Sequence, residues 1–164
     1  MRLLIAAIGK LKDDEERSIV ERYVKRLNVA GKPLGLGPIT ISELPESRAA
    51  AASERKADEA QRLLKATESA LFKIALDEKG KPFSSESFAA LLGKAADTSV
   101  KSCAFLIGGA DGHGSEVLKS SNVVLSLGAM TLPHGLARVI LAEHGYGEGD
   151  IDALLAHGTV AAGS

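Results

Sequence analysis

Two segments of this chain combine the residue types that a small-molecule pocket requires. GGADGHG covers residues 108–114 and LGAMTLPHG covers residues 127–135. The glycines at 108 and 109 carry no side chain, so a ligand can approach the backbone there, although a plain turn has the same composition. The chain contains neither GxGxxG nor GxxxxGK[ST], which disfavours a dinucleotide or nucleoside-triphosphate site.

The second segment carries apolar side chains in a loop, where exposure to water is costly. Leu127, Met130 and Leu132 therefore either cover the core or line an apolar slot. A slot with free backbone N–H and C=O groups would suit an adenine ring, whose faces stack on apolar groups while its edge hydrogen-bonds to the backbone. The residues alone leave both interpretations open.

Polar candidates lie near the same segments. His134 and Arg138 are four residues apart on a helix that Pro133 is expected to open, so they share one face and could hold an anionic substrate, although such pairs are also common on solvated faces. Asp77 follows a predicted strand and is either a third pocket residue or a turn residue. No histidine spacing suits a metal, and no Ser-His-Asp arrangement is apparent.

Periodic apolar patterns predict the elements that must position these residues. Apolar runs bounded by Gly and Pro indicate buried strands, and spacings of three and four indicate helices. Alternation of the two predicts a three-layer α/β domain with a mainly parallel five-stranded sheet, in which ligands bind beyond the carboxyl ends of the strands. The expected strands are 2–9, 39–44, 70–77, 103–107 and 123–127, and the expected helices are 14–27, 47–66, 86–96, 116–119 and 133–142.

Composition limits the class of protein. A length of 164 residues suits one domain, and the net charge of −1 argues against a non-specific nucleic-acid coat but not against a specific RNA enzyme. The single cysteine, Cys103, falls in a predicted strand and cannot form an intrachain disulfide, which favours a reducing compartment. No apolar run reaches the roughly 20 residues of a membrane span. We therefore expect a soluble, cytoplasmic protein.

Several motifs together resemble one known family. GKLK at 9–12, LDEKGKPFSSESFAALL at 76–92, FLIGGADGHG at 105–114 and LSLGAMTLPHGLARVILAE at 125–143 are similar to the ribosomal large-subunit (23S) pseudouridine N3-methyltransferases of the SPOUT superfamily. The resemblance runs in register from residue 1 to about residue 146. The combination of motifs is specific, whereas each motif alone is not.

The resemblance implies a C-terminal trefoil knot, a homodimer, and S-adenosyl-L-methionine as the methyl donor, with neither a metal nor a membrane involved. The implied reaction is methylation at N3 of a pseudouridine in ribosomal RNA of the assembled ribosome. The family positions at the donor pocket include His134 and Arg138, whose implied catalytic role is substrate orientation or charge stabilisation. The implied donor-binding residues are Leu76, Gly108, Leu127, Gly128, Ala129, Met130, Thr131 and Leu132.

The resemblance ends close to the C-terminus. Tyr146 matches the family, but Gly147 replaces an arginine and the following residues are acidic and glycine-rich instead of basic. We therefore expect one methyltransferase domain over residues 1–146 and a divergent, poorly ordered tail over residues 147–164. Two alternatives stay open at this point: a SPOUT methyltransferase acting on another RNA such as transfer RNA, or a catalytically silent relative that binds ribosomes.

Overall fold

A five-stranded parallel sheet runs through residues 1–127, the part of the chain that this computed structural model describes. Each of its pairings is parallel, which confirms the predicted α/β class. The carboxyl ends of all strands therefore lie at one edge of the sheet, here called the carboxyl edge. The strands are β1 (Arg2–Ile8), β2 (Ile39–Leu44), β3 (Phe72–Pro82), β4 (Ser102–Ile107) and β5 (Val123–Ser126), in the order β2-β1-β4-β3-β5.

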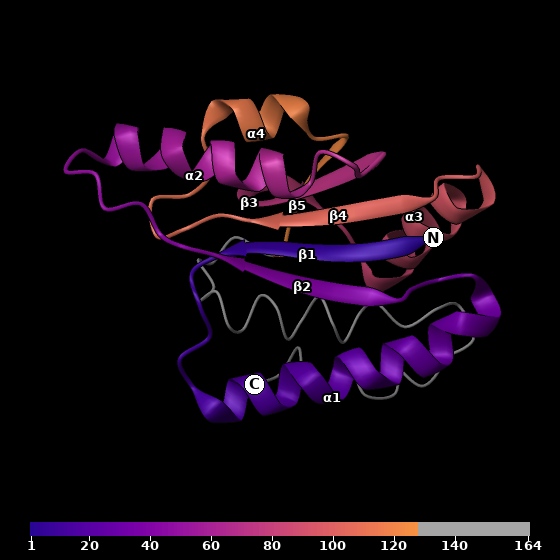
Figure 1. Cartoon of the computed structure of the whole chain (residues 1–164). Coiled ribbons are helices and arrows are strands. Elements are labelled where there is room, and N and C mark those ends of the chain that lie inside the picture. Colours follow the sequence, from indigo (N-terminus) through magenta and orange to yellow (C-terminus); the bar gives the residue numbers. More distant parts are fainter. Residues whose placement is uncertain (128–164) are drawn as a thin grey trace.

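Helices cover both faces of the sheet, giving the three layers that were predicted. The helices are α1 (Asp14–Gly31), α2 (Ala52–Ala66), α3 (Ser85–Asp97) and α4 (Ser115–Ser120), with a short 3-10 turn, η1 (Lys32–Leu34). Figure 1 shows α2 and α4 together on one side of the sheet and α1 on the other. Side chains of α1 and α3 share one core cluster, and those of α2 and α4 share the second. Within residues 1–127, no helix is both long and apolar enough to cross a membrane.

The two sides of the sheet differ in side-chain size. Successive strand residues point to opposite faces, and large side chains such as Ile5, Ile74 and Phe105 face α1 and α3. The face toward α2 and α4 includes three alanines, Ala6, Ala75 and Ala104, and α2 contributes a fourth, Ala60; each is 2% exposed or less. Small side chains in this layer let α2 lie close to the strands and to the loop after β4.

The second helix begins later than predicted. The sequence predicted a helix from residue 47, whereas α2 begins at Ala52. The preceding segment, residues 45–51, instead lies against α2: the Ser47 hydroxyl donates to Asp58 Oδ2 at 2.7 Å, and the Ser47 N–H donates to Glu59 Oε1 at 3.0 Å. These bonds satisfy polar groups of the segment that a helix would have satisfied internally.

The third strand is longer than predicted, because it continues past a bulge. Leu76 and Lys81 are both in register with Leu125 of β5, so residues 77–80, here called the β3 bulge, stand outside the strand register, although the Ser126 hydroxyl of β5 donates to the Glu78 carbonyl at 3.2 Å. Asp77 Oδ1 accepts from the Lys79 N–H at 2.9 Å, which makes Asp77 a turn residue. Gly80 passes so close to β5 that an added Cβ would lie 2.7 Å from the carbonyl carbon of Leu125.

Candidate functional site

Strand register brings three of the predicted donor-binding residues together at the carboxyl edge. Leu76 is in register with Ile107 on one side and with Leu125 on the other. Gly108 follows Ile107 directly, and Leu127 follows two residues after Leu125. The other predicted site residues lie outside the described residues: Gly128, Ala129, Met130, Thr131, Leu132, His134 and Arg138.

This part of the edge offers apolar surface beside backbone polar groups. Leu76 and Leu127 are half-buried and pack against the larger core cluster. On the side of β3 away from β5, β4 ends and Gly108 begins a loop. Apolar walls beside main-chain N–H and C=O groups are what an adenosine-sized ligand requires, so the described residues fit such a group.

The loop after β4, residues 108–114, is a tight turn, here called the glycine loop. Gly109 and Gly112 form an antiparallel bridge, and the Gly112 N–H donates to the Gly109 carbonyl at 3.0 Å. Gly112 has a φ of +82°, which favours glycine. A Cβ on Gly108 would lie 3.0 Å from the carbonyl carbon of Gly112. The backbone of the same loop, at Gly112, therefore takes up the space that a side chain at position 108 would need. The sequence alone did not show this reason for a glycine at position 108.

The end of the glycine loop is anchored to the sheet. His113 is 6% exposed, and its Nε2 lies 3.1 Å from the Leu106 carbonyl of β4. A Cβ on Gly114 would meet the Lys56 carbonyl of α2 at 3.1 Å. Among residues 1–127, no three His, Cys, Asp or Glu side chains gather in a way that could hold a metal ion.

An ion pair joins the glycine loop to α2. Arg55 donates to both oxygens of Asp111, from Nε to Oδ2 at 2.7 Å and from Nη2 to Oδ1 at 3.2 Å. These hydrogen bonds hold the pKa of Asp111 below its ordinary value and raise the pKa of Arg55. Arg55 Nη1 also donates to the carbonyls of Ala49 and Ala50, at 3.1 and 2.8 Å. One side chain therefore connects two loops of the carboxyl edge.

A buried carboxylate lies one helical turn further along α2. Glu59 is 4% exposed, and an added Cβ on Gly109 would lie only 2.5 Å from its Oε2. No described residue donates a hydrogen bond to that oxygen. Sequence reasoning missed both Arg55 and Glu59. The available signal was position: Glu59 is four residues before Leu63, on the stripe of α2 that faces the sheet.

Cys103 belongs to the core and not to the site. It is 0% exposed on β4, and burial raises the pKa of its thiol to about 12. Because the thiolate is the nucleophilic form, a thiol with this pKa is inert at neutral pH. The expectation that Cys103 packs inside a strand is confirmed.

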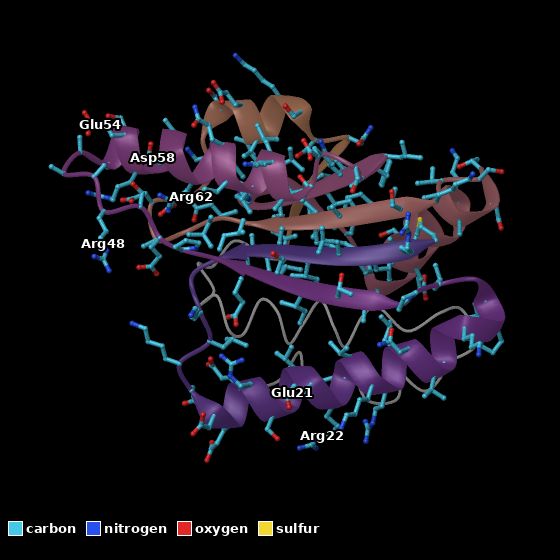
Figure 2. All side chains as sticks on the ribbon, viewed as in Figure 1. Glu21, Arg22, Arg48, Glu54, Asp58 and Arg62 are labelled. Atoms are coloured by element: carbon cyan, nitrogen blue, oxygen red, sulfur yellow. The ribbon has the colours of Figure 1, made fainter. Side chains whose placement is uncertain are left out.

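A concavity on the surface of α2 has the wrong chemistry for an adenosine. Its volume is about 300 Å3, and polar or charged side chains line it: Asp58, Gln61, Arg62 and Lys65. Figure 2 shows Asp58 and Arg62 on α2, close to the segment that leads into this helix. Asp58 accepts from Ser47, and Arg62 donates to the Pro45 carbonyl. These side chains fasten the 45–51 segment.

Comparison with known proteins gives a consistent result. Residues 1–152 match the family model described as "Predicted SPOUT methyltransferase". The chain is 43% identical over 146 residues to "Ribosomal RNA large subunit methyltransferase H" of Brucella anthropi, a match that covers 89% of this chain and 91% of that protein. The protein of the same name from Xanthobacter autotrophicus is 44% identical over the same coverage, and that from Brucella abortus is 42% identical over 155 residues, covering 89% and 92%.

Among solved structures, a protein from Neisseria gonorrhoeae assigned to a methylase family aligns with a TM-score of 0.47 and 12% identity, covering 95% of this chain and 92% of that one. The family assignment rests on the family model and the sequence relatives, and not on the likeness to the Neisseria gonorrhoeae structure.

Proposed function

We propose, because this chain belongs to the SPOUT methyltransferase family, that it transfers a methyl group from S-adenosyl-L-methionine to N3 of a pseudouridine in large-subunit ribosomal RNA. The observation that carries the proposal is the similarity, along nearly the whole chain, to proteins named ribosomal RNA large subunit methyltransferase H. We further propose that the enzyme acts as a homodimer, in the cytoplasm, on the assembled ribosome.

The donor is proposed to bind at the carboxyl edge. Leu76 and Leu127 would provide apolar walls for the adenosine, and the backbone at Gly108 would hydrogen-bond its polar edge. Residues 128–132 would complete the pocket. The support for this placement is the register that sets Leu76 beside Ile107 and Leu125. When bound, the donor supplies a methyl group activated by a sulfonium.

The protein's part in the reaction is mainly positioning. A bond from N3 of the base to the methyl carbon would form as the carbon–sulfur bond broke, S-adenosylhomocysteine would leave, and the N3 proton would pass to water. Holding the two reactants in line contributes a large share of the rate enhancement of such a transfer. We assign substrate orientation or charge stabilisation to His134 and Arg138.

The remaining expectations concern the C-terminal part of the chain. We propose that residues up to 146 complete a single methyltransferase domain closed by a trefoil knot, and that residues 147–164 form a tail separate from it. Because the donor pocket precedes this tail in the sequence, we expect donor binding to be insensitive to truncation after residue 146. Activity on RNA is expected to respond more strongly to that truncation.

The decisive experiment measures transfer of a tritiated methyl group from S-adenosyl-L-methionine to separate RNA substrates. Ribosomes, isolated large subunits, protein-free 23S RNA and transfer RNA are compared, with calorimetry of S-adenosylhomocysteine binding alongside. We expect binding together with labelling of ribosomes. Labelling of transfer RNA alone would instead identify a transfer-RNA enzyme, and binding without any transfer would identify a silent relative. Absence of both would refute the methyl-donor assignment.

A further inference from the structure

We propose that Arg55 and Glu59, one turn apart on α2, are positioning residues that hold the glycine loop in the shape required for donor binding. The proposal rests on the proposed function, because the loop begins at Gly108. Neither side chain is part of the predicted pocket. Both act through the loop that approaches it.

Arg55 fixes the outer part of the glycine loop. Its two bonds to Asp111 fasten the turn between Gly109 and Gly112 to α2. The two side chains are 30% and 25% exposed, so water screens the pair only in part. The planar guanidinium matches both carboxylate oxygens at once, which fixes direction as well as distance. Arg55 therefore restrains the loop in a way that a lysine could not reproduce.

Glu59 fixes the inner part of the glycine loop. Its carboxylate is buried at 4% exposure and occupies the space that a side chain at position 109 would fill. The bond from the Ser47 N–H to Oε1 prevents free rotation of the carboxylate away from the loop. Burying a carboxylate is costly, and this one lies directly against the residue that follows Gly108. The carboxylate thus contacts both the 45–51 segment, through the Ser47 N–H, and the glycine loop, at Gly109.

A matched control lies on the same helix. Arg62 has the same side chain as Arg55 and also donates to a carbonyl of the 45–51 segment, that of Pro45. Within the part of the chain that the structure describes, Arg62 makes no hydrogen bond to the glycine loop. Replacing Arg62 thus removes one positive charge and one hydrogen bond from α2 to the 45–51 segment, but it leaves the contacts of the glycine loop in place.

The test compares Arg55→Ala, Arg55→Lys, Asp111→Asn and Arg62→Ala in the full chain. We expect Arg55→Ala and Asp111→Asn to raise the dissociation constant of S-adenosylhomocysteine about tenfold, with a matching rise in the donor KM and little change in kcat. Arg55→Lys is expected to fall between these variants and the wild type. Arg62→Ala should bind like the wild type. Equal effects of Arg55→Ala and Arg62→Ala would overturn the proposal.

A second readout separates this proposal from the proposed function. Amide hydrogen exchange of residues 108–114 is expected to be about fivefold faster in Arg55→Ala than in Arg62→Ala, and the exchanged-charge variant Arg55→Asp with Asp111→Arg should recover most of the protection. If the wild type does not bind S-adenosylhomocysteine, the proposed function fails whatever the exchange shows. If it binds but exchange in the loop is unchanged in Arg55→Ala, the positioning role is refuted and the function stands.

Discussion

The glycine loop and the β3 bulge lie side by side at the carboxyl edge but are held by different means. Side chains of α2 hold the glycine loop, through the Arg55–Asp111 pair and the Glu59 carboxylate. The β3 bulge is held chiefly through its main chain: Gly80 lies against the backbone of β5, and the Glu78 carbonyl accepts from the Ser126 hydroxyl. A substitution can weaken a side-chain contact by degrees, whereas a Cβ added at a close backbone contact forces the backbone itself to move. The two segments should therefore respond differently to mutation.

The largest effect is expected in the bulge. In Gly80→Ala, the new Cβ would lie 2.7 to 2.8 Å from backbone atoms of Val124 and Leu125, so β5 must move. We expect a loss of about 3 kcal/mol in the free energy of unfolding by urea, together with loss of donor binding, since β5 leads to Leu127. Gly35→Ala is the control, because its Cβ would meet nothing within 4 Å and only its φ of +73° adds strain, about 1 kcal/mol. Similar losses in both variants would contradict this account.

A smaller effect is expected in the glycine loop, because a side chain can yield. Gly109→Ala places its Cβ against Glu59 Oε2, the end of a flexible but buried side chain. We expect a loss of about 1–2 kcal/mol in unfolding free energy. Most of it should disappear when the substitution is made in a Glu59→Ala background, which removes the obstacle. A double-mutant cycle measures this coupling, and strictly additive losses would show that the two residues do not interact.

The ion pair adds a dependence on pH that the bulge lacks. Because Arg55 lowers the pKa of Asp111, the folded state binds that proton less readily than the unfolded state. The stabilisation is therefore present above the ordinary aspartate pKa of about 3.9 and is lost as pH falls through the lower folded value. Melting temperatures of the wild type and Asp111→Asn should differ by a constant amount between pH 5 and about pH 7 and converge under acid. If the difference in melting temperature persisted at the lowest pH, the Arg55–Asp111 pair would be excluded as its source.

The smallest expected effect is at Cys103, which reports whether a disturbance stays local. Its thiol is buried, with a pKa raised to about 12, so a disulfide reagent should not react with the native protein. Reaction should remain negligible in Arg55→Ala, where only the loop is loosened. It should become measurable in Gly80→Ala, because β3 pairs with β4 at Phe72 and Cys103. Rapid labelling in Arg55→Ala would show that the loop's ties support the whole sheet.

The sequence was informative where periodicity is local. Apolar runs predicted all five strands, and the order of strands and helices predicted the parallel sheet. The helix start at residue 47 was wrong because contacts with α2 decide the course of the 45–51 segment, and such contacts leave no periodic pattern. The bulge was missed for a similar reason. DEKG reads as a turn, and only its position beside β5 shows that the strand resumes after it.

The site was predictable in part. The residues following strand ends could be named from the sequence, and register places Leu76, Gly108 and Leu127 together. The supporting residues of α2 could not be named, because Arg55 and Asp111 are 56 positions apart and nothing local relates them. Glu59 gave a weaker but real signal, a carboxylate on a stripe of apolar residues.

The layer of alanines between the sheet and α2 has a consequence for variation far from the pocket. Ala104 and Ala60 are fully enclosed, so a bulkier residue there has no space except by lifting the helix. The arginine and the glutamate would then move away from the turn they hold. A substitution such as Ala104→Val could thus abolish cofactor affinity while every pocket residue keeps its identity. Amino-acid substitutions in this enzyme should accordingly accumulate more slowly in the alanine layer than on the opposite side of the sheet. On that side, large side chains can change in size together with their neighbours.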